Sequence, residues 1–330
     1  MRLIASLFLA ALLSSAARAD TLIVANKVEH TVSFIDLETG EERVRTSTGR
    51  APHEAAVSPD GRTAVVVSYR ERGYDGQSLH VFDFATGART NIIDIAPHTA
   101  PHGLKWIPGT RLVIATTEAT EDVILVDVDA GAVVSSIRTD QRGTHMVALS
   151  PDARRAYTGN IASGTFTVVD LETRAKVRDV KAGRGTEAIT ATPDGKEIWV
   201  GNNSSRNVMV FDAATFERLA TIGTEGVPIR VEISPDGRLA AVSEFDRNVV
   251  GIYETASRER IAEIDLRAAG GTTPVTLLWS PDGALLWAAA TRAARVIEID
   301  AVDWTVRRTL LAGAGSDGLA WSPIDTAPAD

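Results

Sequence analysis

Cysteine is absent from this sequence of 330 residues. Its absence excludes disulfides, cysteine-ligated zinc, thiol nucleophiles and haem attached covalently through a CxxCH motif. Long apolar runs are also missing, because no stretch reaches the roughly 20 apolar residues that a membrane-spanning helix needs. We therefore expect a protein without a membrane span, whose fold rests on packing and on backbone hydrogen bonds.

An excess of basic residues is missing as well. The chain carries 43 acidic and 34 basic residues, which gives a formal net charge of −9 with histidine counted as neutral. Nucleic acids and anionic membranes both attract basic surfaces, so this balance disfavours general binding to either.

The N-terminus has the layout of a cleavable secretory signal. Arg2 precedes a short apolar run from Leu3 to Leu13, and small residues stand at Ala17 and Ala19. Signal peptidase recognises a basic start, a short hydrophobic stretch and small residues just before the cut. We predict a signal peptide over residues 1–19 and a mature chain of residues 20–330 that is periplasmic or secreted.

A repeat runs through the mature chain. The turn motif Ser58-Pro59-Asp60-Gly61 returns in full or in part at positions that begin with Ser150, Thr192, Ser234 and Ser280. With weaker copies included, the turn prolines follow one another at intervals of 42 to 49 residues. Proline presets the backbone, aspartate bonds back to it and glycine accepts a positive φ, so each motif predicts a tight hairpin.

Each repeat predicts four short strands, for example a second strand at Glu197 to Gly201 and a third at Asn207 to Phe211. Four strands in roughly 40 to 50 residues is the period of a β-propeller blade. The chain ends complement each other, because Thr21 to Ser47 supplies a second, third and fourth strand and Gly318 to Trp321 supplies a lone first strand. We predict an all-β, seven-bladed β-propeller in one domain over residues 20–330, with one blade built from both ends, which leaves no open sheet edge.

Three second strands carry a related pattern: LIVAN at Leu22 to Asn26, AYTGN at Ala156 to Asn160 and IWVGN at Ile198 to Asn202. The chain resembles the YVTN-repeat propellers in these segments. That resemblance implies a seven-bladed propeller related to the lactonase-like group and to YncE-like exported bacterial proteins. It implies little about function, because one propeller frame serves many functions.

The position six residues before each turn proline differs from blade to blade. It opens the innermost strand, so it should line the mouth of the central channel. Round the ring this position holds His53, His102, His145, Glu187, Ile229, Val275 and Asp317. Imidazole and carboxylate are ligands of Zn²⁺, Mn²⁺, Fe²⁺ and Cu²⁺. We therefore predict a ligand site formed by an arc of five residues, Asp317, His53, His102, His145 and Glu187. A divalent transition metal is one candidate ligand and an anionic small molecule is the other; a polar opening without a dedicated ligand is the alternative.

Other polar residues are predicted to surround the same opening. Arg50, Arg142 and Arg184 stand three residues farther upstream, and guanidinium groups there would receive a carboxylate or phosphate without any metal. The ends of second strands should approach the funnel with Asn160, Asn202 and Glu244.

Two longer segments interrupt the period, Tyr69 to Ser78 and Arg267 to Pro274. Long loops on a rigid scaffold often carry recognition. The first should form a lip that contacts a partner through Tyr69, Arg70, Arg72 and Tyr74, unless it is a tolerated insertion.

Three functions fit this sequence. The first is an exported binding or scaffolding propeller, expected to be a monomer, that holds an anionic small molecule or a periplasmic partner protein at its channel mouth. The second is a lactonase-like hydrolase with His102 or His145 as general base, since a metal or a base can activate water for attack on a cyclic ester. The third is a redox or haem-related accessory protein in which a histidine ligates non-covalent haem.

Overall fold

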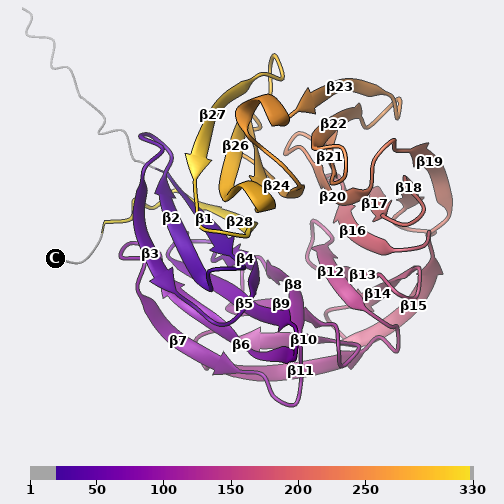
Figure 1. The fold of residues 1–330 in the computed structure, drawn as a ribbon. Coiled ribbons are helices and arrows are strands. Elements are labelled where there is room, and N and C mark those ends of the chain that lie inside the picture. The colour runs from indigo at the N-terminus through magenta and orange to yellow at the C-terminus, as the bar shows by residue number, and fades with distance from the viewer. Residues whose placement is uncertain (1–19, 328–330) are drawn as a thin grey trace, which may run out of the picture.

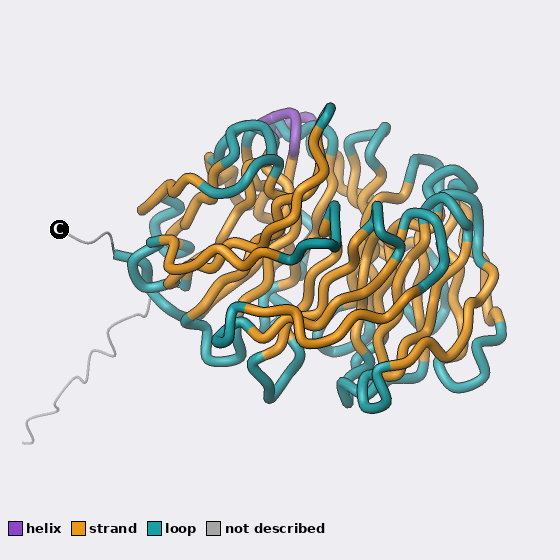
Figure 2. The backbone as a smooth tube through the Cα atoms, turned by 90° about the horizontal axis from the view of Figure 1, so that it is seen from below, coloured by secondary structure: helices purple, strands orange, loops and turns teal. Residues whose placement is uncertain are grey.

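The computed structural model describes residues 20–327, so the predicted signal peptide lies outside the described residues. These residues form seven four-stranded antiparallel sheets arranged as blades around a central axis (Figure 1). Figure 2 shows the ring from the side, with the strands between two layers of connecting loops. No helix in residues 20–327 is long and apolar enough to cross a membrane. The predicted seven-bladed β-propeller is confirmed.

The blade closed by both ends contains β28 (Ser316–Ser322), β1 (Thr21–Asn26), β2 (Thr31–Asp36) and β3 (Glu42–Ser47). The next three blades contain β4 (Pro52–Val57), β5 (Thr63–Glu71), β6 (Tyr74–Asp83) and β7 (Arg89–Asp94); β8 (Pro101–Trp106), β9 (Leu112–Thr117), β10 (Asp122–Asp127) and β11 (Ala132–Arg138); β12 (Thr144–Leu149), β13 (Arg155–Asn160), β14 (Thr165–Asp170) and β15 (Ala175–Lys181). The last three contain β16 (Thr186–Ala191), β17 (Glu197–Asn202), β18 (Asn207–Asp212) and β19 (Arg218–Gly223); β20 (Pro228–Ile233), β21 (Leu239–Glu244), β22 (Val249–Glu254) and β23 (Arg260–Asp265); β24 (Pro274–Trp279), β25 (Leu285–Ala290), β26 (Arg295–Asp300) and β27 (Val306–Leu311). Two short 3₁₀ helices, η1 (Arg267–Ala269) and η2 (Thr291–Ala293), lie between strands.

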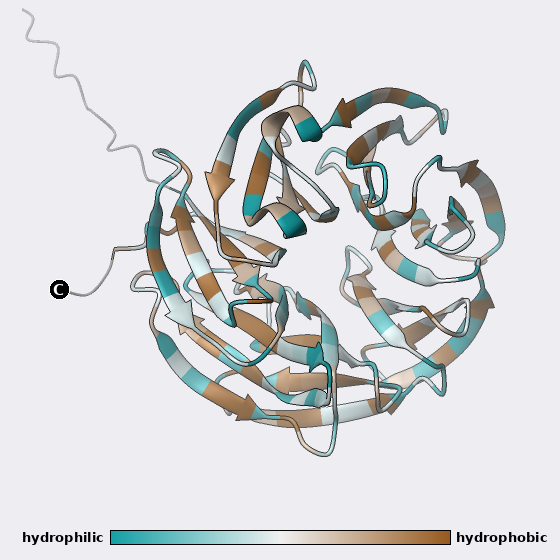
Figure 3. Cartoon of the chain, in the orientation of Figure 1, coloured by the Kyte–Doolittle hydropathy of each residue, from teal (hydrophilic) through white to brown (hydrophobic). Residues whose placement is uncertain are grey.

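Hydrophobicity follows the position of a strand within its blade. The second and third strands of each blade are covered on both faces by the neighbouring blades and are therefore buried, as in β1 and β10. The fourth strands form the rim and alternate between exposed and half-buried residues, as in β3. Figure 3 shows the same gradient, with apolar residues concentrated on the inner strands. Trp199 and Trp287 are among the largest fully buried side chains and fill space between blades.

The repeated turn works as its chemistry predicts. Asp60 accepts hydrogen bonds from the hydroxyl of Ser58 and from the backbone N–H of Arg62. Gly61 has a φ of +75°, a conformation that favours glycine. The turn that begins at Ser280 repeats these contacts. The same hydrogen-bonded turn therefore forms the inner hairpin in these blades.

The two chain ends close the ring. Strand β28 pairs antiparallel with β1, with Leu22 opposite Trp321 and Ile23 opposite Ala320. Ser322 on the same strand also donates to the carbonyl of Gly61 in the next blade. The predicted closure by pairing of the ends is confirmed.

Each innermost strand contains a β-bulge close to its start, on the side of the channel mouth. In β4, for example, the pairing with β5 shifts between Pro52 and Ala55, and β8, β12, β16, β20, β24 and β28 shift at the equivalent place. A bulge inserts one extra residue and re-aims the side chains beside it. Consecutive residues such as His53 and Glu54 can therefore both take part in the interactions at the channel mouth.

The expectation of a long loop between Tyr69 and Ser78 is wrong. The two flanking strands continue as a hairpin, with a register shift between Ser68 and Arg70 and then Arg70 opposite Asp75 and Glu71 opposite Tyr74. The alternating side chains of this segment allow the ladder to extend beyond the length found in other blades. The extension places the ring of Tyr69 inside the mouth rather than on a partner-facing lip, and only 9% of its surface is exposed.

Candidate ligand site at the channel mouth

Three histidines from neighbouring blades form a stack at the mouth. The ring centroid of His102 lies 4.1 Å from that of His53 and 3.6 Å from that of His145. Tyr69 meets His102 edge-on at 4.5 Å and His53 at 5.1 Å. The strand β8 places His102 at the centre of this group, where 2% of its surface is exposed. We call His53, His102, His145 and Tyr69 the histidine cluster.

His145 is held as a cation by two carboxylates. Its Nδ1 lies 2.7 Å from Glu118 Oε2, and its Nε2 lies 3.7 Å from Glu187 Oε1. Burial alone would lower the pKa of His145, but the hydrogen bonds and charges of Glu118 and Glu187 outweigh burial and raise this pKa to about 9. Burial alone would raise the pKa of Glu118, but hydrogen bonds from His145 and Tyr69 outweigh burial and lower this pKa to about 2.

His102 is kept neutral. Burial, followed by the charges of His145 and His53, holds its pKa well below the usual histidine range. Its Nδ1 is buried and has no hydrogen-bond partner within residues 20–327. A buried polar atom without a partner costs free energy, and a neutral imidazole nitrogen can bind a cation, accept a proton or bond to a ligand. Of the two histidines predicted as candidate bases, His102 is the one that is neutral, and its low pKa makes it a weak base.

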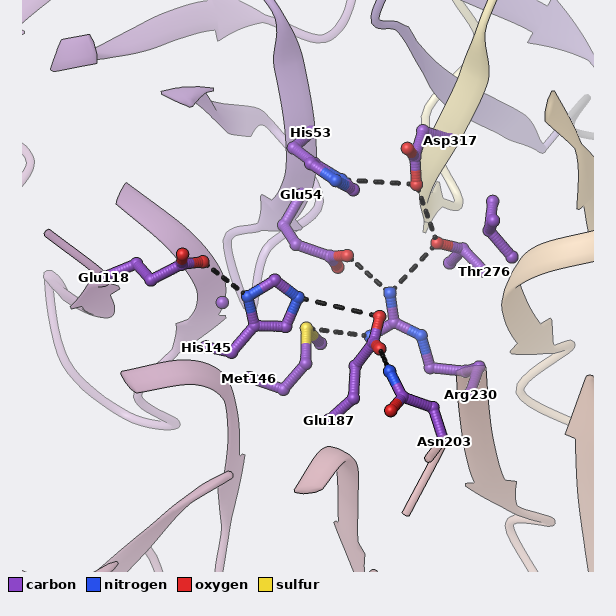
Figure 4. A network of polar contacts seen from close by, with 12 residues as sticks. His53, Glu54, Glu118, His145, Met146, Glu187, Asn203, Arg230, Thr276 and Asp317 are labelled. Atoms are coloured by element: carbon purple, nitrogen blue, oxygen red, sulfur yellow. Dashed lines mark hydrogen bonds and ion pairs between the residues drawn. The ribbon is translucent and has the colours of Figure 1, made fainter. Parts of the chain in front are cut away.

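A single arginine, Arg230, joins side chains of several blades near His53 and His145 (Figure 4). Arg230, from β20, donates through Nη2 to Glu54 at 2.5 Å and to the Thr276 hydroxyl at 3.0 Å. Its Nη1 lies 3.3 Å from the sulfur of Met146. These partners come from three other blades, so the guanidinium spans the channel. Burial alone would lower the pKa of Arg230, but the charge of Glu54 outweighs burial and raises this pKa.

The predicted arc is brought together in two parts. His145 and Glu187 form one part, and Glu187 also accepts a hydrogen bond of 2.5 Å from Asn203. His53 and Asp317 form the other, with His53 Nδ1 3.3 Å from Asp317 Oδ1. His102 lies between them. Metal binding by the full arc stays a prediction.

The predicted arginines lie outside this group. Arg50 is paired with Glu71 and stacks on the ring of Tyr74, at 4.4 Å from its centroid. Arg142 and Arg184 are exposed, and neither has an ion pair in the described part of the chain. Lys27, which sequence reasoning did not select, lies 5.5 Å from the centre of the Tyr69 ring. The surroundings of the cluster therefore include cationic groups that are free to meet an anion.

The selected residues at the ends of second strands are fully buried inside their blades. Asn160 donates to the hydroxyls of Thr165 and Thr167 on the third strand. Asn202 accepts hydrogen bonds from the backbone of Gly183 and from Thr186. These contacts tie strands and loops together, and a binding role for the residues stays a prediction.

Glu244 replaces asparagine at the same position. It accepts a hydrogen bond of 2.5 Å from the backbone N–H of Gly226, as Asn202 does from Gly183. Its other oxygen, Oε1, is buried without a hydrogen-bond partner within the described chain, although Arg260 lies 3.8 Å away. Its contacts are therefore with its own blade.

The remaining histidines lie apart from the cluster and have other partners. His30 Nδ1 accepts the backbone N–H of Ala51, and His98 Nδ1 lies 2.7 Å from Asp122 Oδ2. His80 is buried on β6 next to Ser78. Burial, with a smaller contribution from the charge of Arg89, lowers the pKa of His80 to about 4.

His80 makes stability depend on pH. The pKa of His80 is about 6.5 in the unfolded chain, whereas its pKa in the folded protein is about 4. Stability is therefore expected to be complete above pH 6.5 and to fall by about 3 kcal/mol as the pH drops to 4. The change His80→Gln should remove this part of the slope in urea unfolding measured from pH 4 to 7. An unchanged difference between pH 4 and 7 in the variant would contradict the assignment.

The fold and the mouth define a seven-bladed propeller with a titratable cluster at one end of its channel. Residues 109–258 match the family model of the cytochrome D1 haem domain. This stretch includes His145, Glu187 and Arg230, but not His53 or His102. Among curated proteins, none matches the chain. A chain of hydrazine synthase from Kuenenia stuttgartiensis is similar in structure, with a TM-score of 0.76 and 18% identity over 90% of this chain and 99% of that one. At this identity the likeness shows the fold.

The histidine cluster does not fit a haem group held within it. The His102 and His145 rings stack at 3.6 Å and the His53 ring is tilted against His102 at 4.1 Å, which leaves no slot for a flat macrocycle between them. Next to the cluster, Arg230 is bound to Glu54 and Thr276. We derive no haem chemistry from these residues.

Proposed function

We propose that this chain is an exported propeller that binds a small ligand at the mouth of its channel, with the histidine cluster as the contact surface. The observation that carries the proposal is His102, which is buried, neutral and without a partner at Nδ1. A propeller blade needs no histidine at this place, because equivalent positions hold Ile229 and Val275. Lys27, Arg142 and Arg184 near the opening favour a ligand with an anionic group.

Native mass spectrometry tests this function. Mature protein is purified from the periplasm without a His tag, and its intact mass is compared with the mass of the polypeptide. We expect an additional bound species in the wild type that is lost in His102→Ala and kept in His80→Ala, a matched change at a buried histidine outside the cluster. A wild type that carries nothing, or two variants that behave alike, would contradict the proposal.

A haem-related accessory role is the second candidate, and the match of residues 109–258 to the cytochrome D1 haem domain favours it. A haem would lie outside the histidine cluster, over the loops of the same face. An absorbance spectrum of the protein from the same purification decides this candidate, since bound haem gives an intense Soret band and its absence excludes a resident haem.

A further inference from the structure

A second group of donor atoms lies beside the histidine cluster. His53, Glu54 and Asp317 each offer one such atom, and the three atoms lie within 4.8 Å of one another. His53 and Glu54 belong to the bulge of β4, and Asp317 belongs to the equivalent bulge of β28 in the adjacent blade. Gly318 allows this approach, because a Cβ atom there would lie 1.8 Å from the carbonyl oxygen of His53. The closure of the ring therefore assembles this trio.

The trio carries an unbalanced charge in a buried place. Glu54 and Asp317 are 5% and 3% exposed. Arg230 forms an ion pair with Glu54, whereas it acts on Asp317 only through space. Lys27 acts on Asp317 only through space. Two buried carboxylates therefore share one ion-paired guanidinium, and a bound cation would compensate the second carboxylate, since an uncompensated buried charge is costly.

The arrangement of His53 and Asp317 also suits two ligands of one ion. Their nearest atoms, Nδ1 and Oδ1, are 3.3 Å apart, yet the buried Nδ1 makes no hydrogen bond. The adjacent His102 has a buried Nδ1 that is likewise without a partner. A nitrogen and an oxygen atom at this separation can coordinate the same cation when the nitrogen carries no proton.

We propose that His53, Glu54 and Asp317 bind one divalent transition-metal ion. One imidazole and two carboxylates match the nitrogen and oxygen donors that Zn²⁺ and Mn²⁺ accept, and three protein ligands leave a coordination position open for water or for an anionic ligand. Arg230 holds Glu54 in place, and the Thr276 hydroxyl lies 3.4 Å from Asp317 Oδ1, so both carboxylates are oriented by outer partners. The inference rests on the proposed function, since it names a ligand class for the same mouth.

Calorimetric titration with Zn²⁺ alone tests the trio. The mature, untagged protein is treated with a chelator, and we expect it then to bind one ion per chain. His53→Gln and Asp317→Asn should weaken binding about tenfold or more. Glu232→Gln is the matched control, because Glu232 lies in the same channel and acts on Arg230 but is outside the trio; it should bind Zn²⁺ as the wild type does. Circular dichroism confirms that each variant is folded.

Two results would overturn the metal site. One is a folded wild type without stoichiometric Zn²⁺ binding. The other is Glu232→Gln weakening the affinity as much as His53→Gln does, since binding would then follow the charge of the channel rather than three ligands. If Zn²⁺ fails to bind but the species lost in His102→Ala is present, the trio is wrong and the proposed function stands. If both are missing, both proposals fail.

Discussion

A chain that ends at Ala312 is expected not to form the native ring. The truncation removes β28, which supplies the innermost strand of the closing blade and buries Leu319 and Ala320. It also exposes the apolar face and the backbone edge of β1. Burial of each large apolar side chain contributes about 1.5–3 kcal/mol, so the combined loss reaches the roughly 5–15 kcal/mol that holds a domain folded. Far-UV circular dichroism and urea unfolding should show no cooperative transition.

A circular permutant separates ring closure from chain length. Its chain begins with residues 313–327, continues through a short Gly-Ser linker into residue 20, and ends at residue 312. The linker can be short because Thr21 lies opposite Ser322 in the sheet. The permutant should unfold cooperatively with a stability close to that of the parent. A truncated chain as stable as the permutant would show that the closing strand is dispensable.

Arg230→Met is expected to cost about 3–5 kcal/mol of stability, because it leaves Glu54 buried without its cation. Both side chains are 6% exposed, so solvent screens the pair little. Methionine keeps much of the volume of arginine and removes only the charge and the hydrogen bonds. Urea unfolding in the presence of a chelator measures the loss without any contribution from a bound metal.

The double variant Glu54→Gln with Arg230→Met isolates the cause. It removes both charges, and a buried pair replaced as a unit often costs little. We expect it to recover most of the stability that the single change loses. If the double variant were as unstable as the two single losses added together, then packing rather than the unpaired carboxylate would account for the effect.

The propeller fold could be predicted because the same turn motif and strand pattern recur in successive blades. The Pro-Asp-Gly turns mark the inner hairpins, and unmatched strands at Thr21 to Ser47 and Gly318 to Trp321 require each other. Turn chemistry acts over four residues and does not depend on what surrounds it. Counting back six residues from each turn proline also selected His53, His102, His145, Glu187 and Asp317, which the structure places around one opening.

The composition of the mouth could not be predicted as fully. Glu54 and Arg230 each come directly after a position that the repeat comparison selected, His53 and Ile229. Strict strand alternation would point their side chains away from the channel. The β-bulges re-aim them, and a bulge leaves no clear mark in the sequence. Glu118 lies at the end of a second strand, and no sequence motif there marks its carboxylate as part of the site. Tyr69 was assigned to a loop because the extra length of the hairpin resembled an insertion. The comparison of repeats could have found Arg230, since it is the one arginine at the position after the selected one.

The arginine across the channel also determines how the mouth can be used. Arg230 binds groups from three other blades, so a guanidinium and its partners lie across the centre of the ring. A ligand bound at the histidine cluster is therefore expected to enter and leave by the same face. A partner that delivered or collected such a ligand would be expected to dock on that face, near the exposed Arg142 and Arg184.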